Sequence, residues 1–323
     1  MRGERSDATL ALMRTSLLVV SMLLPACAAP RLTAEQMIST PPKRLALASL
    51  EPRRTVTVLG VELAVHDSDP SSGKPAIFCL HAVGHGGSDF AAFERAFADR
   101  YRILTVDWPG QGASGADPQP ASAIRYAELF DALVQQLEVK SMVLLGNSIG
   151  GAVAIRYAAA HPERVRGVIL TDSGGLDSNP GGFIPGLFIG RIEAKMRQGA
   201  EGDPDFKEWF RDYYGDILLG PVAQAQRDAI VESAYEIAPV LAQAWASFKR
   251  ADSDVRDLAQ GLKMPVLVAW ARKDSLIRWS RNREAVERIP HVQVQLFEAG
   301  HAPFLEVPEA FNEAAATFLA RLP

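Results

Sequence analysis

The chain has few cysteines and no excess of basic residues. Two of its 323 residues are cysteines, Cys27 and Cys79, and 34 lysines and arginines face 38 aspartates and glutamates, for a formal charge of −4. A small disulfide-stapled scaffold needs an even set of closely spaced cysteines, which is missing. A nucleic-acid-binding surface needs a basic stripe, which is also missing, so we expect no nucleic-acid partner. Hydrophobic residues make up 48% of the chain, enough for the core of a soluble globular protein.

The apolar stretch near the N-terminus is too short to span a bilayer. Residues 15–24 are uncharged and rich in Leu and Val, whereas a membrane-spanning helix needs about twenty such residues. The stretch follows three arginines and precedes Pro, Ala and Cys27, which is the order of a secretory signal. A cysteine directly after a small residue resembles a bacterial lipobox. We therefore expect residues 1–27 to be a signal segment and Cys27 to carry a lipid anchor.

The expected location is the cell envelope, where the protein would be held at a membrane as a lipoprotein. Several alternatives stay open: cleavage near Ala29 with secretion or release into the periplasm, a cytoplasmic location, and a start at Met13 rather than Met1. Residues 28–54 contain several prolines and charges, which favours a linker or a loosely packed arm.

Short apolar runs alternate with helical patterns along the rest of the chain. Residues 55–66 alternate apolar and polar side chains, which predicts a β-hairpin. Continuous apolar runs predict strands buried on both faces, and a period near 3.6 predicts the helices between them. The expected strands are residues 76–80, 102–107, 141–145, 165–170, 264–270 and 292–297, and the expected helices are residues 88–98, 121–138, 150–160, 281–288 and 308–322. This alternation predicts an α/β fold with a mostly parallel sheet flanked by helices.

One stretch interrupts the alternation. Residues 176–261 begin with several prolines and glycines and continue as helical patterns with no strong strand. We therefore expect a helical cap there, inserted between the two parts of an α/β core, residues 55–175 and 262–323. Its aromatic residues either pack a small core of the cap or line a pocket beneath it: Trp209, Phe210, Tyr213, Tyr214 and Trp245.

The pattern Gly-x-Ser-x-Gly at residues 146–150 predicts a nucleophile. An apolar strand ends at Gly146 and a helix begins at Gly150, which is the strand-turn-helix setting that this motif requires. The serine of such a turn has strained backbone angles, so its neighbours must lack bulky side chains. The turn would expose the hydroxyl of Ser148, and the helix would direct its first N–H groups toward a developing oxyanion.

A serine hydroxyl needs a base, and the base needs an acid. His301 follows the last expected strand, where a loop can reach over Ser148, so we expect it to be the base. Asp274 ends the preceding strand and is the expected acid, which would accept a hydrogen bond from the imidazole and fix its tautomer. Asp172 ends a strand one step earlier and is the rival acid. Asp107 comes too early in the chain and is expected to brace a loop.

These features together resemble the α/β-hydrolase superfamily over about residues 55–323. The resemblance rests on the loop that begins at His81, the turn at residues 107–112, the nucleophile motif, and the acid and base segments. In that family the loop after the first buried strand usually begins His-Gly, and the next residue donates to the oxyanion. Aligned on His81, the resemblance assigns this donor to Val83.

The second oxyanion donor is the N–H of Ile149, directly after the nucleophile. Ala82 stands where the family usually has Gly, and His81 is expected to buttress the loop. For His85 two alternatives stay open: it lines the pocket, or it faces solvent. The glycine-rich loop lacks the phosphate-binding pattern of a P-loop, and no metal or cofactor is implied.

The resemblance implies a hydrolase but does not determine which type of bond it cleaves. The expected reaction is hydrolysis of a carboxylic ester of a small, partly apolar molecule, through an acyl-enzyme on Ser148. The Gly-Asn-Ser sequence with a helical cap is also similar to meta-cleavage-product hydrolases, which split C–C bonds. Those enzymes often carry Trp after the catalytic His, where this chain has Ala302. A non-catalytic ligand-binding protein on the same fold is the third alternative.

Overall fold

The computed structural model describes residues 50–51, 53–177 and 183–323. The expected signal segment with Cys27 lies outside these residues, as does most of the expected linker. Among the residues described, no helix combines the length and the apolar character needed to cross a bilayer.

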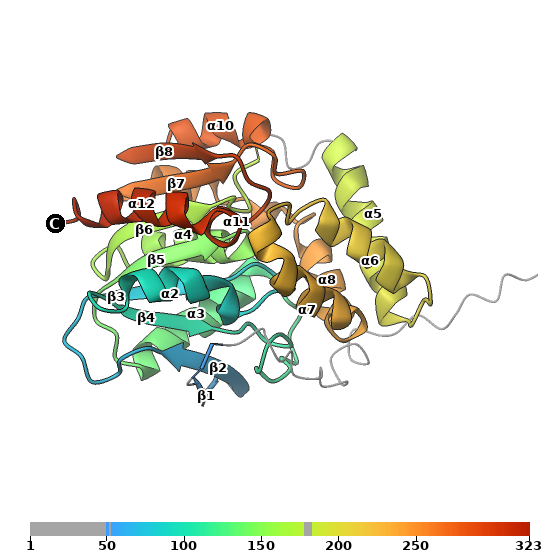
Figure 1. Cartoon of the computed structure of the whole chain (residues 1–323), viewed down its shortest axis with the longest axis horizontal. Helices are drawn as coiled ribbons and strands as arrows, with labels where there is room; N and C mark the ends of the chain where they lie inside the picture. Colours follow the sequence, from blue (N-terminus) through green and yellow to red (C-terminus); the bar gives the residue numbers. More distant parts are fainter. Residues whose placement is uncertain (1–49, 52, 178–182) are drawn as a thin grey trace, which may run out of the picture. The chain divides into compact units, whose positions relative to one another are not determined.

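An eight-stranded sheet forms the centre of the described chain (Figure 1). Its strands are β1 (Arg53–Val58), β2 (Val61–Asp67), β3 (Ala76–Leu80), β4 (Arg102–Val106), β5 (Met142–Asn147), β6 (Val165–Thr171), β7 (Val266–Ala271) and β8 (Val292–Phe297). The spatial order is β1-β2-β4-β3-β5-β6-β7-β8. Strand β2 pairs antiparallel with β1 and β4, and all other neighbours pair in parallel. The predicted hairpin and the mostly parallel sheet are therefore confirmed.

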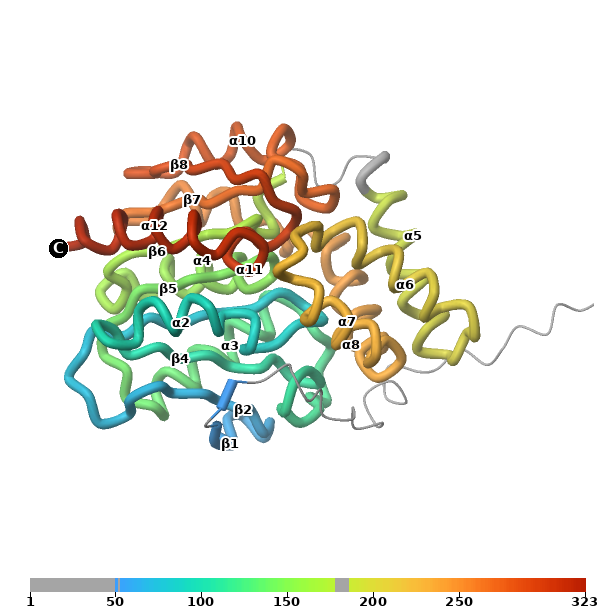
Figure 2. Tube along the Cα trace, viewed as in Figure 1, coloured from blue at the N-terminus to red at the C-terminus, as the bar shows by residue number. Residues whose placement is uncertain are grey.

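Helices cover both faces of this sheet (Figures 1 and 2). On one face α2 (Ala91–Phe97), α11 (Pro303–Glu306) and α12 (Pro308–Leu319) pack together, with the short 3₁₀ helix η1 (Gly87–Phe90) before α2. On the other face lie α3 (Ala123–Gln136), α4 (Ile149–Ala160), α9 (Arg256–Gln260) and α10 (Trp279–Glu287). All five predicted core helices are present, with small shifts at their ends. Helix α11 was not predicted because four residues are too few to show a period.

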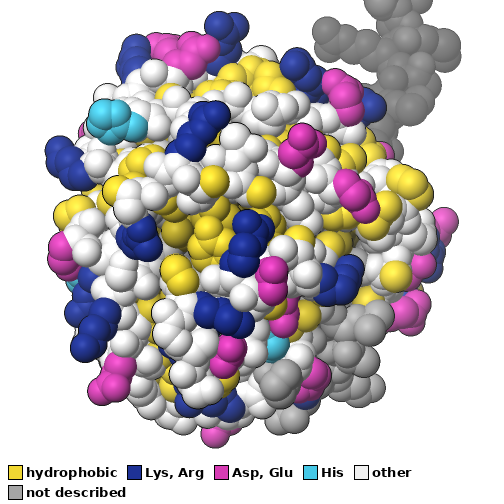
Figure 3. Space-filling model, turned by 60° about the vertical axis from the view of Figure 1, so that its left-hand side comes forward, with side chains coloured by type: hydrophobic (Ala, Val, Ile, Leu, Met, Phe, Trp, Pro, Cys, Tyr) yellow, Lys and Arg dark blue, Asp and Glu magenta, His cyan; other side chains and the backbone are white. Residues whose placement is uncertain are grey.

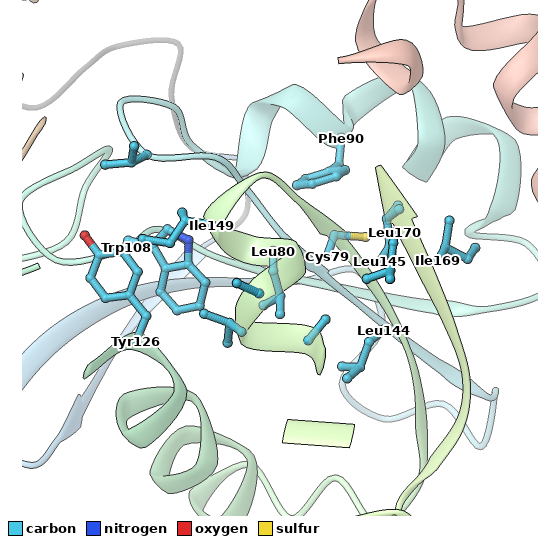
Figure 4. Packing of buried hydrophobic residues seen from close by; sticks show 14 of the residues in the cluster. Cys79, Leu80, Phe90, Trp108, Tyr126, Leu144, Leu145, Ile149, Ile169 and Leu170 are labelled. Atoms are coloured by element: carbon cyan, nitrogen blue, oxygen red, sulfur yellow. The ribbon is translucent and has the colours of Figure 1, made fainter. Parts of the chain in front are cut away.

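The apolar core extends along the whole length of the central strands. Every residue of β3 and β5 is buried, as their continuous apolar sequence predicts. Cys79 and Leu80 belong to a cluster that also contains Trp108 and Tyr126 (Figure 4). The rings of Trp108 and Tyr126 stack with centroids 4.7 Å apart. Because burying each large apolar side chain contributes about 1.5–3 kcal/mol, this cluster holds the loops above it in place.

Between β6 and β7 the described chain forms helices and no strand. These are α5 (Phe183–Ala200), α6 (Phe206–Gly215), η2 (Pro221–Ala223), α7 (Gln224–Glu232), α8 (Ala234–Ser247) and η3 (Ala251–Ser253), followed by α9. Helix α5 packs along α8, and α6 contacts both. The helical insertion that interrupts the α/β alternation is thus present in the structure.

The aromatic side chains of the insertion divide between the two roles left open by the sequence. Phe210 is buried and lies 5.1 Å from Phe206 between ring centroids, so it packs the core of the insertion. Tyr213, Tyr214 and Trp245 instead line a cavity against the sheet.

Candidate active site

Ser148 lies in the turn between β5 and α4, at the carboxyl edge of the sheet. Its backbone angles, φ 55° and ψ −119°, strain any residue that carries a side chain. The motif glycines permit this turn. A Cβ on Gly146 would lie 2.5 Å from the carbonyl oxygen of Gly150, and one on Gly150 would collide with the carbonyl oxygen of Leu80. The spacing of the motif is therefore required by the close packing of β3, β5 and α4.

His301 and Asp274 form a buried hydrogen-bonded pair. Nδ1 of His301 lies 2.8 Å from Oδ2 of Asp274. Oδ1 of Asp274 accepts the backbone N–H groups of Leu276 (2.7 Å) and Ile277 (2.9 Å). Burial opposes ionisation, but the charge and hydrogen bond of His301, with these two N–H groups, outweigh it and hold the pKa of Asp274 below its usual value. Nδ1 of His301 is thus engaged, which leaves Nε2 as the atom that can take a proton from Ser148.

The rival acid Asp172 lies beside Asp274 and is fully buried. Its Oδ1 accepts the N–H of Ala271 at 3.0 Å. Burial and then the neighbouring charge of Asp274 raise the pKa of Asp172 well above its usual value. A carboxyl group whose pKa is raised is less suited to stabilise an imidazolium, and the hydrogen bond of His301 goes to Asp274. The geometry therefore favours Asp274 as the acid.

The loop that carries His301 is tied to the sheet and to the insertion. Nδ2 of Asn147 donates to the carbonyl oxygens of His301 and Thr171, both at 3.0 Å. The backbone N–H of His301 donates to the carbonyl oxygen of Ile217 at 2.6 Å. Asn147 had no predicted role, because the variable position of the Gly-x-Ser-x-Gly motif carries no signal of a contact with a segment so far along the chain.

Glu306 of α11, which had no predicted role, also connects this loop to the insertion. Its Oε2 accepts the N–H groups of Leu219 and Gly220, both at 2.8 Å, and of Gly300 at 3.0 Å. Its Oε1 accepts the N–H of Ala302 at 3.1 Å. The first two donors belong to the insertion, and the last two flank the candidate base. The available signal was an acidic residue within an otherwise apolar segment, because a buried carboxylate must find donors.

Two backbone N–H groups remain open beside Ser148. No residue of the described chain accepts the N–H of Val83 or of Ile149. Ile149 is the first residue of α4, where N–H groups have no partner within the helix. The N–H of Gly84 is engaged by Oε1 of Gln111 at 2.5 Å. The structure thus places both expected oxyanion donors, and not Gly84, at the cavity that Ser148 lines.

His81 supports the loop that carries Val83. Its Nδ1 donates to the carbonyl oxygen of Ala82 at 2.6 Å, and its Nε2 accepts the N–H of Trp108 at 3.0 Å. Burial lowers the pKa of His81 to about 4, so the ring is neutral at neutral pH and can donate and accept at once. Asp107 braces the same region by accepting the N–H of Gly87 at 2.8 Å.

A cavity of about 160 Å³ lies between the sheet and the insertion. From the core it is lined by Val83, Ser148, Ile149 and His301, and from the insertion by Phe188, Tyr213, Tyr214, Leu241 and Trp245. A space-filling view of one face shows apolar side chains gathered in a hollow among charged ones (Figure 3). The site therefore combines mostly apolar walls with a candidate nucleophile, a candidate base and two N–H groups without acceptors among the described residues.

His85 also lines this cavity and does not face solvent, which decides between the two alternatives left by the sequence. Only 2% of the residue is exposed. Its Nδ1 lies 2.6 Å from Oδ2 of Asp89, and its ring lies against Tyr214.

Comparisons with known proteins agree with this geometry. The chain is similar to 2-hydroxy-6-oxononadienedioate/2-hydroxy-6-oxononatrienedioate hydrolases. That of Paraburkholderia phymatum is 29% identical over 271 residues, which cover 80% of this chain and 92% of that protein. That of Burkholderia vietnamiensis is 28% identical over 273 residues, which cover 81% of this chain and 93% of that protein.

Solved structures with the same fold include a thermophilic esterase from Thermogutta terrifontis, with a TM-score of 0.70 and 22% identity over 83% of this chain and 98% of that one. The enol-lactonase from Burkholderia xenovorans LB400 has a TM-score of 0.69 and 20% identity over 83% of this chain and 100% of that one. The sequence profile of the alpha/beta hydrolase family matches residues 77–314, which include every candidate residue of the site. The chain therefore belongs to the alpha/beta hydrolase family and is a hydrolase of that fold.

Proposed function

We propose that this hydrolase is a serine carboxylesterase acting on small, uncharged and partly apolar esters. The observation that carries the proposal is the lining of the cavity beside Ser148. Its walls are mostly apolar, and they include aromatic side chains of the insertion. An apolar pocket with a few polar groups at one end suits an ester whose carbonyl reaches the nucleophile while its chain lies among the aromatic rings.

The charges in the lining disfavour the dianionic substrates that the names of the curated relatives imply. Apart from histidines, the charged lining residues of the described chain are Asp177, Asp252 and Arg281. Arg281 is bound to Asp177 at 2.8 Å. An entering dicarboxylate would meet two acids and a guanidinium that is already paired, and burying an uncompensated charge is costly. A neutral ester meets no such cost.

The proposed reaction uses the pairs already described. His301 takes the proton of Ser148 as Oγ forms a bond to the ester carbonyl carbon, and the oxyanion accepts the N–H groups of Val83 and Ile149. The bond to the leaving alcohol oxygen then breaks, and that oxygen takes the proton from the imidazolium. Water repeats these steps on the acyl-enzyme and releases the acid and free Ser148. Asp274 stays ionised throughout and stabilises the imidazolium.

C–C bond hydrolysis of a dienolic diketone is the second candidate. It is supported by the 29% identity to the hydrolase from Paraburkholderia phymatum. Against it stands Ala302, a fully buried small residue where meta-cleavage-product hydrolases often carry Trp. The two reactions share the nucleophile and the base, so the substrate must decide between them.

Turnover of p-nitrophenyl acetate, butyrate and octanoate, together with labelling by a fluorophosphonate, tests the proposal. We expect hydrolysis and labelling of the wild type, and loss of both in Ser148→Ala. Ser141→Ala, at an exposed residue just before β5 and at the opposite end of that strand from Ser148, is the matched control and should behave as the wild type. Bleaching of the absorbance of a 2-hydroxy-6-oxo-dienoate, without turnover of any aryl ester, would overturn the esterase proposal in favour of C–C bond hydrolysis. An absence of labelling and of both activities would favour a ligand-binding protein.

A further inference from the structure

A second buried histidine–aspartate pair borders the cavity. Nδ1 of His85 lies 2.6 Å from Oδ2 of Asp89, and the two residues are 2% and 1% exposed. Oδ1 of Asp89 accepts a hydrogen bond from Nε2 of Gln226, in α7 of the insertion, at 2.6 Å. The proposed ester hydrolysis uses His301 and Asp274 and gives this second pair no task.

Asp89 determines which nitrogen of His85 is offered to a substrate. An ionised carboxylate can only accept hydrogen bonds, and Oδ1 of Asp89 already accepts one from Gln226. Nδ1 of His85 therefore carries the proton between the two residues, and in the neutral imidazole Nε2 carries a lone pair. No hydrogen bond joins Nε2 to any residue of the described chain, and His85 is part of the cavity lining. The cavity thus contains a fixed acceptor at Nε2.

The hydroxyl of Tyr214 supplies a donor to the same cavity. The rings of Tyr214 and His85 have centroids 5.6 Å apart. A Cβ on Gly84, between Val83 and His85, would lie 2.6 Å from the hydroxyl oxygen of Tyr214. This hydroxyl also lacks a hydrogen bond to any described residue, and Tyr214 lines the cavity. Burial raises the pKa of Tyr214 well above its usual value, so the oxygen keeps its proton.

A donor next to an acceptor fits a hydroxyl group, which donates one hydrogen bond and accepts another. A carbonyl oxygen would leave Nε2 of His85 without a donor, and a carboxylate would face its lone pair. Gly84 adjoins the proposed oxyanion donor Val83, so a group held there lies close to the reacting carbonyl. We propose that His85 and Tyr214 form a hydroxyl-binding site, and, resting on the proposed ester hydrolysis, that the substrates are esters of 2- or 3-hydroxy acids.

Binding to the Ser148→Ala protein tests this site separately from catalysis. Titration calorimetry compares ethyl 2-hydroxybutyrate and ethyl 3-hydroxybutyrate with ethyl butyrate. Two neutral hydrogen bonds should make one of the hydroxy esters bind about tenfold more tightly than the plain ester. Adding Tyr214→Phe, which removes only the donor oxygen, or His85→Phe, which removes the acceptor, should bring the ratio of dissociation constants close to one. Tyr235→Phe, on the exposed side of α8, is the matched control and should keep the preference.

The possible outcomes distinguish failure of the hydroxyl-binding site from failure of the proposed ester hydrolysis. Equal affinity for hydroxy and plain esters, or a preference that survives both Tyr214→Phe and His85→Phe, overturns the hydroxyl site whatever the turnover. Tighter binding of monoethyl succinate than of either hydroxy ester also overturns it, because this would indicate a charged imidazole that binds a carboxylate. A hydroxyl preference in a protein that hydrolyses no ester would leave the site standing and overturn the proposed function alone. Tyr214→Phe keeps the test valid if His85→Phe does not fold.

Discussion

Replacing Glu306 should reduce both the stability of the fold and the activity of the site. Its carboxylate is 3% exposed and accepts backbone N–H groups on both oxygens, at 2.8–3.1 Å. Glu306→Gln keeps the shape of the side chain but turns one acceptor oxygen into an NH₂ group. That group must then face at least one N–H group at hydrogen-bond distance.

The size of the effect follows from these contacts. A hydrogen bond to a charged group contributes about 1.5–3 kcal/mol, and a buried donor left without an acceptor costs about 1–3 kcal/mol. If the amide oxygen replaces Oε2, three hydrogen bonds persist in a weaker neutral form and the N–H of Ala302 loses its acceptor. We therefore expect Glu306→Gln to lower the free energy of unfolding by about 2–4 kcal/mol, and Glu306→Ala to lower it by more than about 4 kcal/mol.

Activity should fall with stability, because two of the four donors flank His301. A base displaced from the nucleophile lowers kcat more than it changes KM. Urea denaturation followed by circular dichroism gives the free energy, and p-nitrophenyl butyrate turnover gives kcat and KM. Glu313→Gln, exposed on α12, is the matched control and should stay within about 0.5 kcal/mol of the wild type. A Glu306→Gln protein as stable and as active as this control would refute the reasoning.

The remaining predictions concern three side chains, Asp274, Asp172 and Cys27. Asp274→Asn should lower kcat by about 10³–10⁴-fold, because the imidazole loses its ionised partner, and an unchanged kcat in ester turnover would contradict that role. Because the folded-state pKa of Asp274 is depressed, its contribution to stability is present above the unfolded value of 3.8 and is lost as pH falls, so the destabilisation by Asp274→Asn should shrink toward acid pH. Asp172 has a raised folded-state pKa, so its protonated form contributes stability that is fully present below 3.8 and is lost as pH rises. The free energy of unfolding of Asp172→Asn, measured by urea denaturation, should therefore rise relative to that of the wild type between pH 4 and 8. A difference between the two proteins that does not change with pH would count against a raised pKa of Asp172. Finally, we propose that Cys27 is lipidated: Cys27→Ser should move the protein from the membrane to the soluble fraction, and unchanged sedimentation with membranes would exclude that anchor.

Much of the fold could be predicted because its signals are local. Strands β3 and β5 are buried on both faces, and continuous apolar runs such as Ile77–Leu80 report that burial directly. The turn at Ser148 could be predicted because its motif is short and local, and a Cβ on Gly146 would collide with Gly150 within the same turn; the collision of Gly150 with the carbonyl oxygen of Leu80 instead involves a neighbouring strand. His301 and Asp274 followed from chain order, since parallel strands bring their carboxyl ends to one edge of the sheet.

The remaining contacts could not be predicted because they join segments that are distant in the sequence. Asn147 reaches the carbonyl oxygen of His301, and Gln226 of the insertion reaches Asp89 of the core. Neither contact has a period or a motif, and each depends on how the insertion packs on the sheet. The pairing of His85 with Asp89 has the i,i+4 spacing of a helix, but it lies in a loop and a 3₁₀ turn, where that spacing carries no expectation.

The hydrogen bonds between the insertion and the loop that carries His301 limit how this hydrolase can be re-engineered. Ile217 accepts the N–H of His301, and Leu219 and Gly220 donate to Glu306, so the segment 217–220 helps to hold the loop of the candidate base. We therefore expect that grafting a whole insertion without this segment would displace His301 as well as change the cavity walls. Chimeras that exchange α5 and α6 but keep the segment 217–220 and Glu306 should alter the walls of the cavity and leave the position of His301 unchanged.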